Sequence, residues 1–368
     1  MKLNIILILI ITYFNSGCTK KNNNLFEKAI IGESFALKGE EDKQFFKKLT
    51  QITSVYGYAN SKKIYFTEGV DYLIDYEAGS IKRTKLSAIP NYNDHKVIRD
   101  GNNKFDFASN PRNPEENIKY QVFVDYKYLS ENYTIHQKNY YLSKSSTTKL
   151  NTKQPYKICV IGTSITNAAH TISEYYFNGS KSSAFWSVLG TNLSKYYQSI
   201  ITVENLSDSI GNGTSNGLQD TILLNKVIAK NPGCILIEYG MNDHYVGSDS
   251  KGFDSKISNS IRFFKSKGID VALIGFFRQN PDWNNEDRSN TILFNEILRT
   301  IASKENVYFV DVEAAFLKIK KKNMYEDVMG DFIHHPVDFG HKIYFSELLP
   351  VFLDKDIEHS NFADFIDL

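Results

Sequence analysis

The strongest constraint on the fold is a regular alternation of two hydrophobic patterns after residue 155. Near-continuous apolar runs, typical of strands covered on both faces, occur at Lys157–Ile161, Ile200–Asn205, Cys234–Tyr239, Val271–Phe276 and Val307–Val310. Stretches with the apolar spacing of helices lie between them, at Ala184–Tyr197, Leu218–Lys230, Lys256–Lys267 and Asn290–Lys304. Strict β–α alternation with short loops predicts a parallel sheet with helices on both faces, and places functional residues at the carboxyl ends of the strands.

Residues with useful chemistry follow the predicted strands. The first strand runs into Gly162-Thr163-Ser164, the second is followed by Gly211-Asn212-Gly213, and the third by Gly240-Met241-Asn242-Asp243. The segment Asp331-Phe332-Ile333-His334-His335-Pro336 comes near the C-terminus. Because the carboxyl ends of parallel strands share one edge of a sheet, we expect these groups to meet there.

Together these residue types can supply a serine acyl-transfer site. A serine is a weak nucleophile until a histidine takes its proton, and that histidine needs a carboxylate to fix its tautomer. Ser164, His335 and Asp331 can fill these roles. A tetrahedral intermediate also needs donors for its oxyanion, and the Gly211 N–H and the Asn242 amide are the candidates.

The four blocks, in this order, resemble those of the SGNH (GDSL-type) hydrolase family. Gly162–Thr166 resembles the first block, with Thr163 where the family name has aspartate, and Gly240–Asp243 resembles the third. In the second block the resemblance implies Gly211 as the oxyanion glycine, with Gly213 as the alternative. It covers about residues 156–353 and implies a flavodoxin-like three-layer α/β fold and a serine esterase that needs no metal or organic cofactor.

The last block contains two candidate bases. His334 has the family's Asp-x-x-His spacing from Asp331, whereas His335 precedes Pro336. Subfamily members with an Asn-His-Pro-Asn-Asp-Phe-Gly-His-like ending are most similar to residues 334–341 here, and in them the histidine before proline is the base. We therefore predict His335 as the base and Asp331 as its orienting carboxylate, with His334 as the alternative base. His170 and residues 167–183 are expected to shape the substrate entrance.

Residues 25–150 have a different pattern. Short alternating or aromatic-rich runs broken by turn residues predict an all-β, sandwich-like accessory domain ahead of a hydrolase domain at residues 151–368. Within it, Phe45–Thr53 is a candidate short helix. The Ser-, Thr- and Lys-rich segment Ser143–Pro155 has the composition of a linker.

The first residues have the form of a targeting signal. Lys2 precedes an apolar run at Ile5–Phe14, and Ser16-Gly17-Cys18 follows. This resembles the lipobox of bacterial lipoproteins, and implies a signal peptide at residues 1–17, a lipid-modified Cys18, a tether at residues 18–24 and a body facing the periplasm or the outside. Secretion without a lipid is the alternative.

Charge and composition exclude other classes. With 43 Lys+Arg against 42 Asp+Glu and no run of five like charges, the chain lacks the basic patch of a nucleic-acid binder. Only 3 cysteines argue against a disulfide scaffold. The family resemblance makes an O-acetylated carbohydrate the first expected substrate. A glycan O-acetyltransferase, a lysophospholipase or thioesterase, and a non-catalytic glycan-binding lipoprotein remain alternatives.

Overall fold

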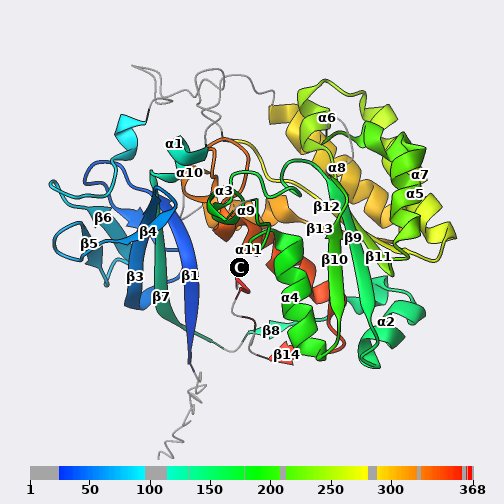
Figure 1. Cartoon of the computed structure of the whole chain (residues 1–368), viewed down its shortest axis with the longest axis horizontal. Helices are drawn as coiled ribbons and strands as arrows, with labels where there is room; N and C mark the ends of the chain where they lie inside the picture. Colours follow the sequence, from blue (N-terminus) through cyan, green and yellow to red (C-terminus); the bar gives the residue numbers. More distant parts are fainter. Residues whose placement is uncertain are drawn as a thin grey trace, which may run out of the picture.

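The computed structural model describes residues 25–95, 114–131, 133–177, 179–207, 213–280, 288–320, 325–358, 362 and 364–366. The predicted signal peptide, Cys18 and the tether lie outside these residues. The described chain forms an N-terminal region of antiparallel sheets, residues 25–131, and a C-terminal region built on a parallel sheet, from residue 133 onward (Figure 1). Among the described residues, no helix combines the length and the apolar character that crossing a membrane requires.

The parallel sheet has five strands in the order β10-β9-β11-β12-β13. The strands are β9 (Tyr156–Gly162), β10 (Ile201–Asn205), β11 (Cys234–Glu238), β12 (Asp270–Ile274) and β13 (Tyr308–Val310). All five apolar runs in the C-terminal half are therefore strands. Every residue of β11 is buried, as a strand covered on both faces requires. This order places the first strand, β9, beside both β10 and β11, so that their carboxyl ends adjoin.

Helices cover both faces of this sheet, which confirms the predicted three-layer arrangement (Figure 1). Helix α4 packs on β10 and on α11, while α7 and α8 pack on each other and on β12. The helix bounds are α2 (Lys144–Asn151), α3 (Ile172–Tyr176), α4 (Phe185–Tyr197), α5 (Thr221–Ala229), α6 (Met241–Tyr245), α7 (Ser250–Ser266), α8 (Arg288–Glu305), α9 (Val312–Lys320), α10 (Tyr325–Val328) and α11 (Asp338–Leu348).

The N-terminal region contains two antiparallel sheets and the short helix α1 (Pro114–Ile118). One sheet has the order β1-β7-β3-β4, with β1 (Phe26–Ala36), β7 (Gln121–Ser130), β3 (Leu49–Ala59) and β4 (Lys62–Tyr65). The other has the order β2-β6-β5, with β2 (Lys43–Gln44), β6 (Ser80–Arg83) and β5 (Tyr72–Asp75). Phe45, directly after β2, contacts Phe35 of β1 and Tyr126 of β7 edge-on, with ring centroids 5.1 and 4.9 Å apart. The expected β-rich region is thus present.

Three local expectations were wrong. The segment Phe45–Thr53 is not a helix, because from Leu49 it pairs with β7 as strand β3. The segment Ser143–Pro155 is not a linker: Ser143 caps α2 by accepting from the Ser146 N–H, and Leu150 is buried. The alternating pattern of residues 25–150 also predicts a strand at Thr134–Leu142, but only Thr134–Ile135 forms one, β8, which pairs with β14 (Ile357–Glu358).

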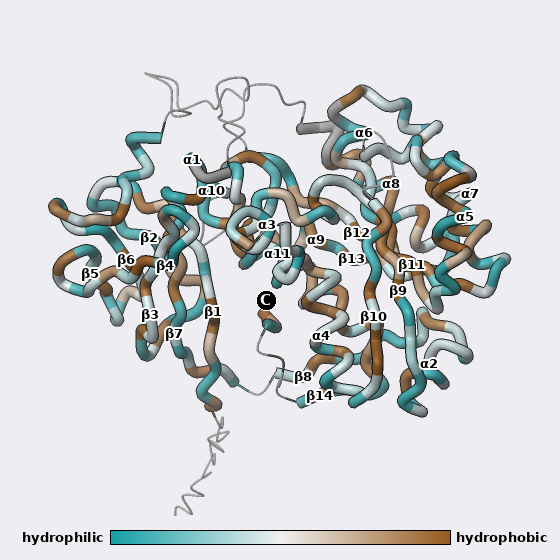
Figure 2. The backbone as a smooth tube through the Cα atoms, viewed as in Figure 1, coloured by the Kyte–Doolittle hydropathy of each residue, from teal (hydrophilic) through white to brown (hydrophobic). Residues whose placement is uncertain are grey.

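The two regions share one hydrophobic core and are joined by buried polar contacts. The Ala36 N–H at the end of β1 donates to Asp327 Oδ1 over 2.8 Å, and Gln121 Nε2 at the start of β7 donates to the carbonyls of Glu326 and Met329. In Figure 2, hydrophobic residues gather along the strands of both regions. The N-terminal region therefore fixes α10, which leads directly into the segment Asp331–His335.

Candidate active site

Ser164 lies in a tight turn at the carboxyl end of β9. Gly162 begins this turn because no side chain fits there: a Cβ on it would lie 2.3 Å from Thr166 Oγ1 and 2.6 Å from the Glu238 carbonyl oxygen. Thr163, Ile165 and Thr166 are buried, whereas Ser164 is partly exposed. The turn therefore presents the serine hydroxyl and hides its neighbours.

A buried carboxylate that no sequence pattern predicted holds this turn. Glu238, at the end of β11, accepts through Oε2 from the Thr163 N–H at 2.9 Å, the Thr163 hydroxyl at 2.7 Å and the Thr166 hydroxyl at 2.9 Å. Burial raises the pKa of Glu238 to about 7, against the lowering effect of these hydrogen bonds. Its signal in the sequence is an acid at the end of an otherwise apolar buried strand.

The structure brings Ser164, His335 and Asp331 into one hydrogen-bonded chain. His335 Nε2 lies 2.8 Å from Ser164 Oγ, and His335 Nδ1 lies 2.6 Å from Asp331 Oδ2. Asp331 Oδ1 also accepts from the backbone N–H groups of Ile333, His334 and His335, at 2.9, 2.8 and 2.9 Å. One carboxylate thus fixes both the loop and the imidazole that the loop carries.

The electrostatics of this chain suit proton transfer. Burial lowers the pKa of His335, although the Asp331 carboxylate opposes that effect. Burial acts to raise the pKa of Asp331, but the neighbouring His334 and His335, together with the hydrogen bond from His335, hold that pKa well below its usual value. At neutral pH the site therefore contains an ionised carboxylate and a neutral imidazole, which is the state in which a base can accept the proton of Ser164.

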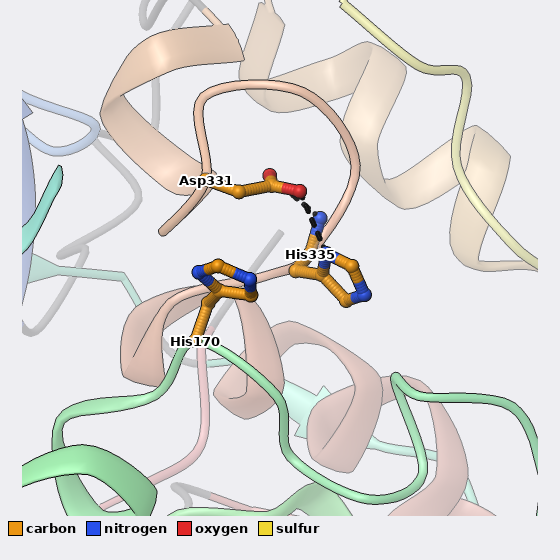
Figure 3. Close-up of side chains that lie close together, drawn as sticks. All are labelled: His170, Asp331 and His335. Carbon is orange, nitrogen blue, oxygen red and sulfur yellow. Dashed lines mark hydrogen bonds and ion pairs between the residues drawn. The ribbon is translucent and has the colours of Figure 1, made fainter. Parts of the chain in front are cut away.

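His334 and His170 flank the imidazole of His335. The His334 ring lies 3.9 Å from it, centroid to centroid, and its Nδ1 is 3.3 Å from Asp331 Oδ2. The His170 ring stacks on it at 4.8 Å and 27°, from the loop after β9 (Figure 3). Of the two candidate bases, His335 is the one that the structure places against Ser164. His170, expected to shape the substrate entrance, contacts the candidate base.

His170, Asp331 and His335 are also the described residues whose ligand atoms lie close enough to hold a metal ion, all within 4.8 Å of one another. Both ring nitrogens of His335, however, already face Ser164 and Asp331. A metal at this point would have to displace one of these contacts, so the arrangement fits proton transfer better than metal ligation.

Asn242 and Gly213 lie beside the nucleophile turn. Asn242, in α6 after β11, donates from Nδ2 to the Gly213 carbonyl at 3.2 Å. Gly213 has φ +55°, and a Cβ on it would lie 2.9 Å from Asn242 Nδ2 and 3.5 Å from Thr163 Cα. The alternative oxyanion glycine therefore contacts the first and third sequence blocks. The first choice, Gly211, lies outside the described residues.

A second serine has the Gly-x-Ser-x-Gly surroundings of a nucleophile, at Gly213-Thr214-Ser215-Asn216-Gly217. Ser215 is fully buried, and its N–H and hydroxyl both donate to Asp243, the hydroxyl at 2.5 Å. Ser215 therefore stabilises the loop instead of offering a hydroxyl to a substrate.

A family model matches the C-terminal region of the chain. The model of the GDSL-like lipase/acylhydrolase family matches residues 160–343. No curated protein matches the chain. Similar solved structures include Axe2, an acetylxylan esterase from Geobacillus stearothermophilus, with 21% identity, a TM-score of 0.44, and coverage of 54% of this chain and 94% of that one.

Two further structures have equal or lower TM-scores. LAE5, an alpha/beta hydrolase enzyme from the metagenome of Lake Arreo, has 18% identity and a TM-score of 0.44, covering 54% of this chain and 94% of its own. The esterase EstA from Pseudoalteromonas sp. has 20% identity and a TM-score of 0.40, covering 52% and 93%. Because the family model spans half of the chain and includes the turn of Ser164, Asn242 and the loop of His335, the chain belongs to the GDSL-like lipase/acylhydrolase family, a family of carboxylic ester hydrolases.

Proposed function

We propose that this protein is a serine esterase that removes acyl groups, O-acetyl first, from a carbohydrate. The observation that carries the proposal is the continuous chain from Ser164 Oγ through the imidazole of His335 to Asp331, with separations of 2.8 and 2.6 Å. Such a chain activates a serine for attack on an ester carbonyl. The same chain counts against a non-catalytic glycan-binding role.

The proposed reaction has two steps. His335 takes the proton of Ser164 as Oγ attacks the ester carbonyl, and then gives it to the departing alcohol, leaving an acyl-serine. Water, deprotonated by His335, attacks the acyl-serine, and His335 returns the proton to Ser164 Oγ as the acid leaves. In both steps the Ser164 N–H, the Asn242 amide and the N–H of Gly211 or Gly213 hold the oxyanion. Asp331 stays ionised and holds the imidazole in position.

The surroundings of the triad support a small acyl group on a polar alcohol. The imidazoles of His170 and His334 pack on His335, and Asn242 with Gly213 adjoins the nucleophile turn. These groups offer hydrogen bonds and little apolar surface, which suits acetyl better than a long acyl chain. The carbohydrate portion of the substrate rests on the resemblance to family members outside the cytoplasm that carry a β-rich accessory region.

Hydrolysis of p-nitrophenyl acetate, butyrate and octanoate by the purified full-length protein tests the chemistry. We expect acetate to be the best substrate, and Ser164→Ala to lower its kcat by at least about 10³-fold. Release of acetate from acetylated xylan and acetylated chitooligosaccharides then tests the carbohydrate portion. Equal rates with and without Ser164→Ala would contradict the triad, and a preference for octanoate would indicate a lipid substrate. Acetylation of an added saccharide would indicate a transferase.

We also propose that Cys18 carries a lipid anchor that holds the protein at the bacterial cell envelope. The support is Lys2, the apolar run Ile5–Phe14 and the small residues before Cys18. Radiolabelled palmitate should be incorporated into the protein in a bacterial host, and Cys18→Ala should abolish the label. Equal labelling of the two proteins would contradict the anchor.

A further inference from the structure

A cavity separate from the triad lies between the two regions of the molecule. It has a volume of about 280 Å³, at the lower end of the range of ligand pockets, roughly 300 Å³. Its lining comes from β1, β3 and β7 on one side and from α3, α4 and α11 on the other. Figure 1 shows β1 and α4 on either side of α11. Neither region forms this cavity alone.

Strand β1, which borders the cavity, departs from regular strand geometry there. Between Ile30 and Glu33, β1 gains one residue against β7, which is a β-bulge, and Gly32 there has φ +72°. The Gly32 N–H leaves the strand ladder and donates to Asp125 Oδ1 at 2.8 Å, and the Ile31 carbonyl accepts from Lys342 Nζ at 3.1 Å. Gly32 also leaves space, because a Cβ on it would meet only the Tyr56 hydroxyl, at 3.4 Å.

The lining is rich in hydrogen-bonding groups. Eight of its fourteen residues carry hydroxyl, carboxylate or ammonium groups. Lys342 and Asp364 pair at 3.1 Å, which leaves Asp338 as the lining carboxylate without a paired cation among the described residues. An anionic ligand is therefore disfavoured.

Two lining side chains retain capacity for a ligand. The Asp338 carboxylate accepts from the Ile172 N–H at 2.7 Å and from the Ser183 side chain, and a carboxylate can accept about four hydrogen bonds. The Tyr58 hydroxyl has no hydrogen-bond partner in the described part of the chain, and the Tyr58 ring is held by stacking on Tyr176 at 5.3 Å. A carboxylate, hydroxyl donors and fixed aromatic rings on one small surface match the hydroxyl groups and C–H faces of a pyranose ring.

From these contacts we infer that the cavity is a saccharide subsite, which binds one pyranose unit of the glycan through Asp338, Tyr58 and the neighbouring hydroxyls. The inference rests on the proposed function, because it names where the carbohydrate of that substrate is held. Residues of the subsite lie close in sequence to His170 and His335 of the candidate active site. Ile172 follows His170 by two residues, Asp338 follows His335 by three, and the hydrogen bond between Ile172 and Asp338 joins these two segments.

The test measures binding without turnover, on the full-length protein carrying Ser164→Ala. Isothermal titration calorimetry with xylohexaose, cellohexaose and N-acetylchitohexaose should show saturable binding of at least one of them. Thr191→Trp, a bulky change at an exposed residue of α4 that lines the cavity, should weaken that binding by at least tenfold. Ile222→Trp, on α5 and 66% exposed, is the matched control and should leave it unchanged. Equal melting temperatures show that both variants are folded.

A smaller change refines the same test. Tyr58→Phe removes one hydroxyl and keeps the ring, and should weaken binding by about three- to tenfold. Tyr140→Phe, at a tyrosine that is 68% exposed and outside the cavity lining, is its control and should have no effect. Binding that Thr191→Trp leaves intact would place the saccharide elsewhere and overturn the inference, as would no binding of any of the three oligosaccharides.

The two proposals can fail separately. In one outcome, the protein with Ser164 intact releases no acetate from acetylated oligosaccharides, but the Ser164→Ala protein binds them and Thr191→Trp abolishes this binding. The esterase proposal then fails and the subsite stands. If acetate is released but Thr191→Trp changes neither binding nor KM, the subsite fails and the esterase stands.

Discussion

Asp331 decides which of two adjacent histidines can act as the base. Three consecutive N–H groups converge on its Oδ1, and the resulting tight loop directs His335 Nδ1 to its Oδ2. His335 Nε2 is then free to meet Ser164, whereas His334 packs its ring against that of His335. The sequence spacing alone favours His334, and the folded loop favours His335.

Substitution of each histidine by alanine separates these roles. We expect His335→Ala to lower kcat on p-nitrophenyl acetate by about 10⁴-fold or more, because the proton acceptor is lost. His334→Ala should lower kcat by less than about tenfold, because it removes a neighbour of Asp331 and His335 but leaves the proton acceptor in place. Steady-state kinetics of the two variants at one pH measure the difference. A larger loss in His334→Ala than in His335→Ala would reverse the assignment.

The pH profile reports the buried state of His335. Burial lowers its pKa below the usual 6.5, so the imidazole stays neutral and able to accept a proton as the pH falls through 6.5. We expect the acid limb of kcat/KM, which reports the free enzyme, to have its midpoint below pH 6.5. The profile should be measured between pH 4 and 9, with protein stability checked at each point. A midpoint above 6.5 would show that Asp331 outweighs burial.

At the scale of elements, Glu238 ties the turn after β9 to the end of β11. Its pKa is raised by burial from 4.5 to about 7, so between these pH values the folded state binds a proton that the unfolded chain has released. The free energy of unfolding should therefore fall as the pH rises from about 4.5 to 7, by about 3 kcal/mol.

Glu238→Gln tests this contribution. Glutamine keeps an oxygen that can accept from Thr163 but cannot ionise, so the variant should lose the part of the pH dependence that Glu238 contributes. Urea unfolding at pH 5 and pH 8 measures the change. Glu296→Gln, at a side chain that is 58% exposed, is the control and should keep the dependence of the unchanged protein. Identical pH dependence in Glu238→Gln would mean that Glu238 is ionised throughout this range.

The sequence predicted best the elements whose secondary structure depends least on contacts with distant parts of the chain. The apolar runs and helical spacings after residue 155 became strands and helices because burial on two faces, or on one stripe, is encoded within each segment. The segment Phe45–Thr53 was misread because its strand is defined by pairing with β7, more than 70 residues away. Glu238 was missed for the same reason: its partners Thr163 and Thr166 are separated from it by 75 and 72 residues.

The candidate site was predictable where residues in one short block act together. Asp331 and His335 are four residues apart, and the strand-end position of Ser164 follows from the β–α pattern. The ring of His170 on His335 was not predictable, because it depends on how the loop after β9 crosses Gly330. A Cβ on Gly330 would lie 2.3 Å from the His170 carbonyl oxygen. Only glycine permits that crossing.

At the scale of the whole molecule, a buried ionic cluster couples the two regions. We define it as Lys43 of β2 with Glu326 and Asp327 of α10; Lys43 Nζ lies 3.1 Å from Asp327 and 3.4 Å from Glu326. Burial acts to lower the pKa of Lys43, but the two carboxylates together raise it, so the ammonium stays charged in the interface. Because α10 leads into the Asp331 loop, the N-terminal region should stabilise the triad.

Lys43→Met tests this coupling. Asp327 would remain fully buried without its ammonium partner, and breaking a buried ion pair in this way typically lowers the free energy of unfolding by about 3–5 kcal/mol. Since the two regions share one core, we expect a single calorimetric unfolding transition, shifted as a whole to lower temperature.

The exposed pair of Lys82 with Asp42, 3.8 Å apart in the same region, provides the control: Lys82→Met should change the free energy of unfolding by no more than about 0.5 kcal/mol. Two transitions, of which Lys43→Met leaves the later one unchanged, would contradict this coupling. The loss of Lys43 would then destabilise the N-terminal region alone, and the parallel-sheet region would hold its triad without it.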